Sequence, residues 1–131
     1  MTLAERQAEV VRCLVAGGPV PPGFDPERLA ATRKALLRKR SGEVGRAWPE
    51  LAASYGERWH DTFAAWAEGK PPLGSQLDGY DFALEHPPTG AAAVELMVFE
   101  VSRRKPPAFQ YRHRVLVINI GGRVRVFGRV N

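Results

Sequence analysis

The chain has 131 residues, a formal net charge of +5 at pH 7 and one cysteine, Cys13. This length fits one domain with an ordinary core, and a single cysteine excludes an internal disulfide framework. No apolar run approaches the roughly 18 residues of a membrane span, and residues 1–16 carry charges unlike those of a signal peptide. We therefore expect a cytoplasmic protein that does not associate with membranes.

The N-terminal part predicts two helices. Residues 2–16 begin with a capping box and end at a Gly-Gly pair. Asp25, which is followed by proline, begins the second helix. Residues 41–45 include a serine and two glycines, which have low helix propensity. We therefore expect a kink or break in this helix near residue 41.

An aromatic stretch at residues 44–66 holds all three tryptophans. Residues 49–55 predict a short helix between a proline and a glycine. Trp59, Phe63 and Trp66 follow with the spacing of one helical face. Because large aromatic side chains dominate core energetics, we expect the other elements to pack around Trp48, Trp59, Phe63 and Trp66.

Two further helices are predicted before the C-terminal strands. Asp78 and Gly79 are expected to open a short helix that a Pro-Pro pair at residues 87–88 closes. Asp78 serves there as a helix cap. Residues 90–104 alternate partly like a strand, but their length and triple alanine favour a helix.

The C-terminal residues predict a β-hairpin. Two β-rich runs, 112–120 and 123–130, flank Gly121-Gly122, which suits a two-residue type I′ turn. That turn pairs Val117 with Val126 and Asn119 with Val124 on an apolar face, and Ile118 with Arg125, Ile120 with Arg123 and Leu116 with Phe127 on the opposite, exposed face. The segment Phe109–Tyr111 could lead into the same sheet. A lone hairpin is only marginally stable, so the valine face must rest on helices or a further strand.

These elements predict an α+β fold that is mostly α. A bundle of four or five helices around the aromatic core occupies residues 1–105. A basic hairpin or small sheet, residues 106–131, packs on it to give a single compact unit.

Basic residues form two groups. Residues 90–131 carry eight Lys or Arg and only Glu95 and Glu100 as acids, which suggests an acidic partner. The candidate partner-binding residues are Arg33, Lys34, Arg38, Lys39 and Arg40 on the second helix, and Arg114, Arg123 and Arg125 on the hairpin.

Catalytic or metal-binding patterns are not evident. His60, His86 and His113 lie far apart on different predicted elements, and no serine lies in a nucleophile motif. Glu57, His60 and Asp61 share one helical turn, but no second pair of ligands has the spacing of a metal site. We therefore expect no enzyme activity, no cofactor and no metal.

Several short motifs occur in a recognisable order: Arg28-Leu29-Ala30, Trp48-Pro49, Gly56-Glu57 before Trp59, Pro71-Pro72, and Gly79 with Phe82. Residues 5–100 thereby resemble the N-terminal module of a bacterial family described as DNA-binding domains. The resemblance implies a helical fold. It also implies a role as a non-catalytic accessory protein beside iron-dependent enzymes that modify ribosomal peptides, as in methanobactin-type pathways.

The leading functional hypothesis is a recognition or adaptor module that binds a protein or peptide through its C-terminal part. The alternative is a DNA-binding protein that uses the basic stripe of the second helix and a wing-like hairpin carrying arginines. The exposed hairpin face could equally serve a homodimer.

Overall fold

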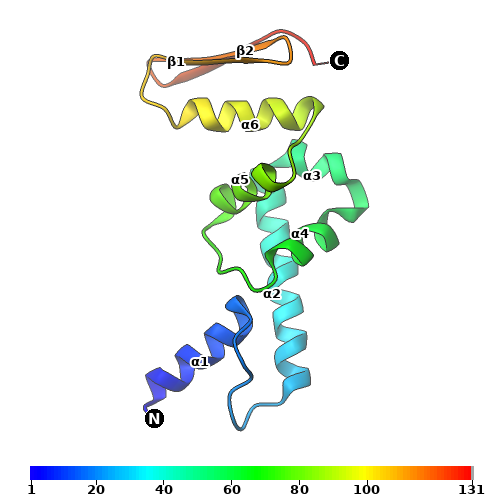
Figure 1. Ribbon diagram of the computed structural model, residues 1–131, viewed down its shortest axis with the longest axis vertical. Helices are drawn as coiled ribbons and strands as arrows, with labels where there is room; N and C mark the ends of the chain where they lie inside the picture. The colour runs from blue at the N-terminus through cyan, green and yellow to red at the C-terminus, as the bar shows by residue number, and fades with distance from the viewer. Residues whose placement is uncertain (131) are drawn as a thin grey trace.

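The computed structural model describes residues 1–130 as a helical body followed by a three-stranded antiparallel sheet. Its elements are α1 (Leu3–Ala16), α2 (Pro26–Ala47), α3 (Pro49–Tyr55), the 3-10 turn η1 (Gly56–Arg58), α4 (Trp59–Ala67), α5 (Ser75–Glu85), α6 (Gly90–Ser102), β1 (Ala108–Arg112), β2 (Val115–Ile120) and β3 (Arg123–Phe127). The predicted α+β, mostly α class is confirmed. The molecule is elongated, with α1 at one end and the sheet at the other (Figure 1).

Local sequence signals place the first two helices correctly. The Thr2 hydroxyl accepts the Glu5 backbone N–H at 3.1 Å, and the Glu5 carboxylate accepts the Thr2 N–H at 2.7 Å, which completes the capping box. The Asp25 carboxylate accepts the Glu27 N–H at 3.0 Å at the start of α2. Each cap satisfies backbone donors that have no partner within the helix.

The expected kink near residue 41 is wrong, because α2 runs unbroken from Pro26 to Ala47. Its small residues serve packing instead. The Trp59 indole N–H donates to the Ser41 carbonyl at 2.9 Å, and a Cβ at Gly45 would lie 3.0 Å from that indole nitrogen. The low-propensity segment therefore lets α4 approach α2 closely, and this packing keeps the helix intact.

The predicted aromatic core is confirmed, and it includes one more central residue, Phe82. Trp48, Trp59 and Phe63 are buried, and Trp66 is half-buried at the edge of the same cluster. Phe82 of α5 lies among them, fully buried, with its ring centroid 5.3–5.8 Å from the nearest rings of α3 and α4. These separations suit tilted and edge-to-face aromatic packing. The five helices α2 to α6 contribute to this core.

Helix α5 begins earlier than expected, and Asp78 is not its cap. Gly74 occupies the N-cap position. Asp78 instead lies buried in the first turns, where its carboxylate accepts the Arg40 Nε–H at 2.8 Å and the Leu73 backbone N–H at 3.1 Å. The ion pair therefore joins α5 and the preceding loop to α2.

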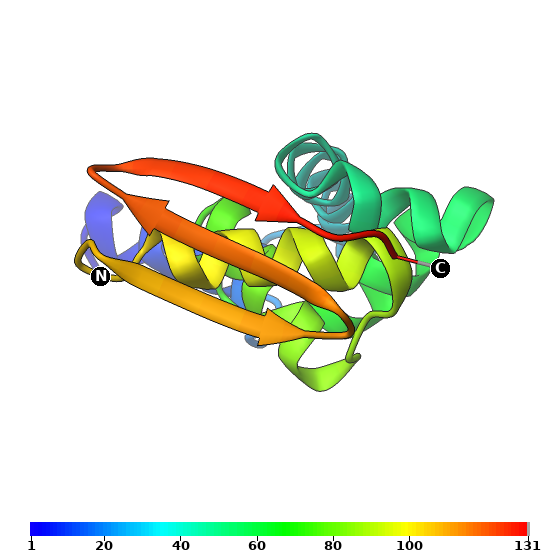
Figure 2. The ribbon, with the colours of Figure 1, turned by 90° about the horizontal axis from the view of Figure 1, so that it is seen from above.

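The C-terminal sheet has the predicted register. Strand β2 pairs with β3 through Val117–Val126, Ile118–Arg125 and Ile120–Arg123, and β1 joins the other side of β2. Residues 90–102 are helical, as expected, and α6 lies across one face of the sheet (Figure 2). Met97 and Val101 of α6 form a second buried cluster with Val115 and Val117. Among residues 1–130, no helix is long and apolar enough to cross a membrane.

Candidate binding surface

The sheet presents its outer face to solvent. Side chains alternate along each strand, so those that do not face α6 share this outer face: Phe109, Tyr111, Leu116, Ile118, Ile120, Arg123, Arg125 and Phe127. Tyr111, Leu116 and Phe127 form one cross-strand row, and Phe109, Ile118 and Arg125 form the next.

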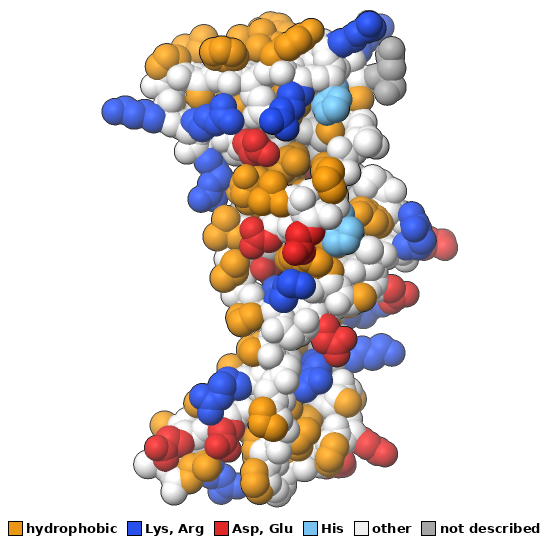
Figure 3. Space-filling model, viewed as in Figure 1, with side chains coloured by type: hydrophobic (Ala, Val, Ile, Leu, Met, Phe, Trp, Pro, Cys, Tyr) orange, Lys and Arg blue, Asp and Glu red, His pale blue; other side chains and the backbone are white. Residues whose placement is uncertain are grey.

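Apolar and aromatic side chains make up most of this outer face. Phe109 is 69% exposed, Ile120 65% and Phe127 55%. Figure 3 shows hydrophobic side chains covering the sheet end of the molecule. Contiguous exposed apolar patches commonly mark interaction sites. The outer face is therefore a candidate contact surface.

The free edge of β3 is a second feature of the sheet. Within residues 1–130, strand β3 pairs only with β2, so its other edge has no neighbouring strand. Ile120 pairs with Arg123 across the two-residue turn at Gly121-Gly122, and the residues that flank such a turn form a hydrogen-bonded pair. The alternation of an antiparallel ladder then directs the backbone groups of Val124 and Val126 to the free edge. Unpaired strand edges are templates for a further strand.

An apolar hollow of about 340 Å³ lies beside this edge, between β3 and the helices α3 and α6. Val94 and Val98 of α6, Val115 of β2 and Val126 of β3 line it. Val126 is 47% exposed although its side chain faces the helical side of the sheet. An added strand at this edge would cover these valines.

Glu95 at the wall of the hollow fastens α6 to α3. Its carboxylate accepts the backbone N–H of Leu51 at 2.8 Å and of Glu50 at 3.2 Å, at the start of α3. Burial raises the pKa of Glu95 above its usual value, although these two hydrogen bonds act in the opposite direction. These two hydrogen bonds hold α3 and α6, the helices that border the hollow, against each other.

The five basic residues predicted on α2 do not form one free basic stripe. Arg33 donates two hydrogen bonds to the Cys13 carbonyl, at 2.8 and 3.2 Å, and so fastens α1 to α2. Arg40 is held by the buried Asp78 and by the Lys70 carbonyl. Lys39 pairs with Glu43 at 4.0 Å on the surface. Lys34 and Arg38 are exposed and line a shallow hollow that also includes Glu68.

The three hairpin arginines occupy two places. Arg123 and Arg125 lie exposed on the outer face of β3, close to its free edge. Arg114 lies in the turn between β1 and β2, at the opposite end of the strands, with φ +64°. The sheet end and the α2 residues are separated along the long axis of the molecule (Figure 1). The structure therefore places the two predicted basic groups on different parts of the protein.

Sequence reasoning missed two parts of this surface. The outward aromatic residues of β1, Phe109 and Tyr111, extend the exposed face, and the alternation of β1 could have revealed them. The hollow beside β3 joins valines of α6 to Val126. No local pattern could indicate it, because it depends on how the sheet is placed on the helix.

The histidine residues lie in separate environments. The His60 ring Nδ1 lies 2.6 Å from the Ser41 hydroxyl, and the His86 ring stacks on Phe82. His113 lies exposed in the β1–β2 turn. Within residues 1–130, no group of three His, Cys, Asp or Glu side chains is arranged to hold a metal ion.

Comparison with known proteins identifies the helical part of the chain. The family described as "SCO6045-like, C-terminal domain" matches residues 4–88, which span α1 to α5. A "UPF0276 protein" of Streptomyces avermitilis is 42% identical over 85 residues, which are 64% of this chain but only 17% of that protein's length. No solved structure matches significantly. The family match covers more than half of the sequence, so the chain belongs to the family of SCO6045-like C-terminal domains.

Proposed function

We propose that this protein is a non-catalytic adaptor that captures an extended acidic peptide on the free edge of β3 and presents it to a companion enzyme. The observation that carries this proposal is the juxtaposition of an unpaired strand edge with the apolar hollow lined by Val94, Val98 and Val126. An extended peptide that adds to a sheet edge gains affinity from main-chain hydrogen bonds and specificity from pockets for alternate side chains.

The proposed peptide has an alternating pattern that follows from pairing with β3. Residues that pair opposite Val124 and Val126 would point toward the hollow and should be apolar. The intervening residues would lie beside Arg125 on the outer face, where acidic side chains gain opposite-charge cross-strand contacts. No Asp or Glu follows Glu100 in the sequence, so the sheet itself offers no competing carboxylate. The preferred ligand is an alternating apolar and acidic strand.

The proposed companion enzyme is a UPF0276 protein, and two observations support this choice. In the Streptomyces avermitilis relative, the matched segment belongs to a much longer chain that bears the UPF0276 name. The motif resemblance separately implies accessory proteins of iron-dependent, peptide-modifying enzymes. Both observations favour a module that acts together with a larger protein.

A labelled peptide tests the capture step. The probe is a fluorescein-labelled ten-residue peptide of alternating valine and glutamate, titrated against the full chain and followed by fluorescence anisotropy. Val126→Pro removes an outward N–H without removing a hydrogen bond to β2, because the backbone groups of this residue face the free edge. We expect at least a tenfold loss of affinity.

A matched change on the opposite edge is the control. In β1 the equivalent outward-facing position is Phe109, since the two-residue turn after β1 places Arg112 and Val115 in a hydrogen-bonded pair. Phe109→Pro should leave peptide affinity within about twofold. Circular dichroism establishes that both variants fold. Absence of peptide binding by the unaltered protein, or equal losses in the two variants, would refute capture at β3.

DNA binding stands as the alternative and rests on the exposed arginines Arg123 and Arg125. It is less favoured because Arg33 and Arg40 are engaged in contacts within the protein. A random-sequence DNA duplex titrated at two salt concentrations tests it. Binding through phosphates would weaken steeply as salt rises, and the Arg123→Glu/Arg125→Glu double variant would abolish it.

A further inference from the structure

Helix α1 leaves several apolar side chains exposed to solvent. Its principal packing partner is α2, and Cys13 is its single buried residue. Leu3 is 72% exposed and Val11 54% exposed. Phe24, in the connector between α1 and α2, is 38% exposed and lines the same hollow as these two residues.

These side chains form the wall of an open hollow of about 690 Å³. Its lining residues are Leu3, Arg6, Gln7, Val10, Val11 and Phe24. We call this surface the α1 face. It lies at the end of the molecule opposite the sheet (Figure 1). It is therefore separate from the proposed peptide site.

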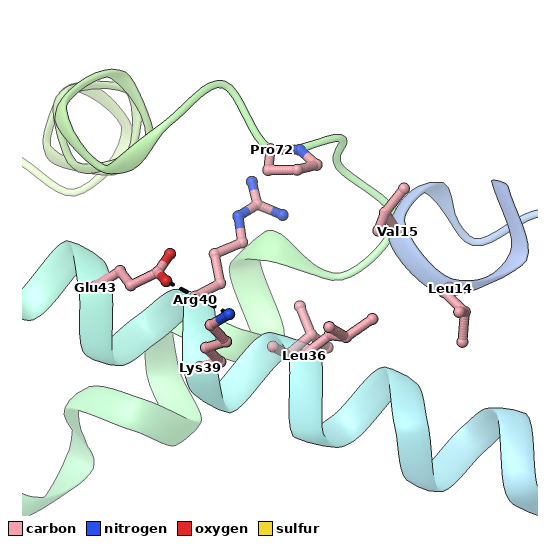
Figure 4. Close-up of a pocket in the computed structure, with 8 residues that line it drawn as sticks. Leu14, Val15, Leu36, Lys39, Arg40, Glu43 and Pro72 are labelled. Carbon is pink, nitrogen blue, oxygen red and sulfur yellow. Dashed lines mark ion pairs between the residues drawn. The ribbon is translucent and has the colours of Figure 1, made fainter. Parts of the chain in front are cut away.

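A second hollow lies where the C-terminal end of α1 meets the helical body. Leu14 and Val15 of α1, Leu36 of α2 and Pro72 of the loop between α4 and α5 border a space of about 190 Å³ (Figure 4). Lys39 and Glu43 form an ion pair at its rim. Helix α1 thus has unfilled apolar space on both sides, while Arg33 fixes its end through the Cys13 carbonyl.

The place of α1 in the sequences of family members indicates which partner covers its exposed face. The matching family is a C-terminal domain, so in its members the rest of the protein precedes this module. The match begins at residue 4, in the first turn of α1. Helix α1 is therefore the first element of the module that follows the preceding part in sequence. The Streptomyces avermitilis relative, of which the matched segment is 17%, carries the UPF0276 name.

We infer that the α1 face is the docking surface for a UPF0276 protein. This inference rests on the adaptor role proposed above and names the surface that joins the adaptor to its companion. The segment that matches the family contains α1 and excludes α6 and the sheet, so the companion would meet a part of the chain that family members share. Peptide capture and companion docking then occupy opposite ends of the molecule.

Complex formation tests the inference. The probe is a purified UPF0276 protein that lacks any segment matching residues 4–88, mixed with the full chain and measured by calorimetry and size-exclusion chromatography. We expect a one-to-one complex. Val11→Glu places a charge in the α1 face, and we expect at least a tenfold weaker complex because a buried unpaired carboxylate is costly.

The matched control changes an equally exposed leucine elsewhere. Leu84, on α5, is 53% exposed and lies outside the α1 face. Leu84→Glu should leave the complex within twofold of the unaltered protein. Absence of a complex at tens of micromolar, or equal weakening by both variants, would overturn the inference.

The same variants separate this inference from the proposed function. Val11→Glu should retain affinity for the valine–glutamate peptide, and Val126→Pro should retain the UPF0276 complex. If Val126→Pro abolished the complex while Val11→Glu left it intact, the companion would dock at the sheet and the assignment to α1 would be wrong. Loss of peptide binding alone would refute the peptide site and leave the α1 assignment standing.

Discussion

A glycine-to-alanine change at residue 79 should destabilise the protein, contrary to the usual effect of this substitution in a helix. Alanine in place of an interior helical glycine normally adds about 0.5–1 kcal/mol of stability. At Gly79, however, a Cβ would lie only 2.1 Å from the Trp48 ring, far closer than atoms can pack. The indole would have to move.

The cost of moving Trp48 can be estimated from its surroundings. Its side chain is 2% exposed, its ring centroid lies 4.8 Å from that of Phe99, and its indole N–H donates to the Gln76 carbonyl at 3.1 Å. Overpacking a core costs about 1–3 kcal/mol, and a lost hydrogen bond about 1 kcal/mol. We expect Gly79→Ala to lower the free energy of unfolding by about 1–3 kcal/mol after the helix-propensity gain.

Gly42→Ala in α2 is the matched control. Its Cβ would meet only the flexible Arg46 guanidinium, at 3.8 Å, so the ordinary gain of about 0.5–1 kcal/mol should appear. Urea unfolding followed by circular dichroism at 222 nm measures both variants. Thermal midpoints should shift in opposite directions, by about 4 °C per kcal/mol. A Gly79→Ala protein as stable as the unaltered one would refute the close packing of α5 on Trp48.

Three further changes test other contacts. Arg40→Ala should cost about 3 kcal/mol because it leaves the buried Asp78 carboxylate unpaired; a double-mutant cycle in urea measures the coupling. Gly128→Ala should cost more than about 1 kcal/mol by thermal unfolding, because φ is +115° and a Cβ would lie 2.4 Å from the Arg114 carbonyl oxygen. Burial raises the pKa of Glu95, so its stabilising contribution is present below pH 4.5 and lost as pH rises through the folded-state value. Relative to Glu95→Gln, the unaltered protein should therefore gain stability in unfolding experiments as pH falls from 7.

The strand pairing shows where sequence reasoning is strong. The turn at Gly121-Gly122 adopts φ values of +59° and +82°, which glycine tolerates readily. A two-residue turn fixes the register of its strands, so each cross-strand partner follows from counting. The helix caps at Thr2 and Asp25 were predictable for the same reason, since the interacting groups lie within three residues.

The candidate site was predictable only in part. The exposed position of Arg123 and Arg125 followed from strand alternation. The apolar hollow beside Val126 did not, because its other walls come from α6 and α3. The separation of the α1 face from the sheet likewise depends on how the helices stack along the molecule.

By itself, the sequence determined the caps, the hairpin register and the identity of most core aromatic residues. These depend on neighbouring residues or on the burial preference of large rings. Only the tertiary structure decided the roles of Asp78, Arg40 and the small residues of α2. A carboxylate that resembles a helix cap becomes half of a buried ion pair when an arginine 38 positions away faces it. A glycine that would weaken an isolated helix makes room for Trp59, because the contacts that determine its effect come from distant parts of the chain.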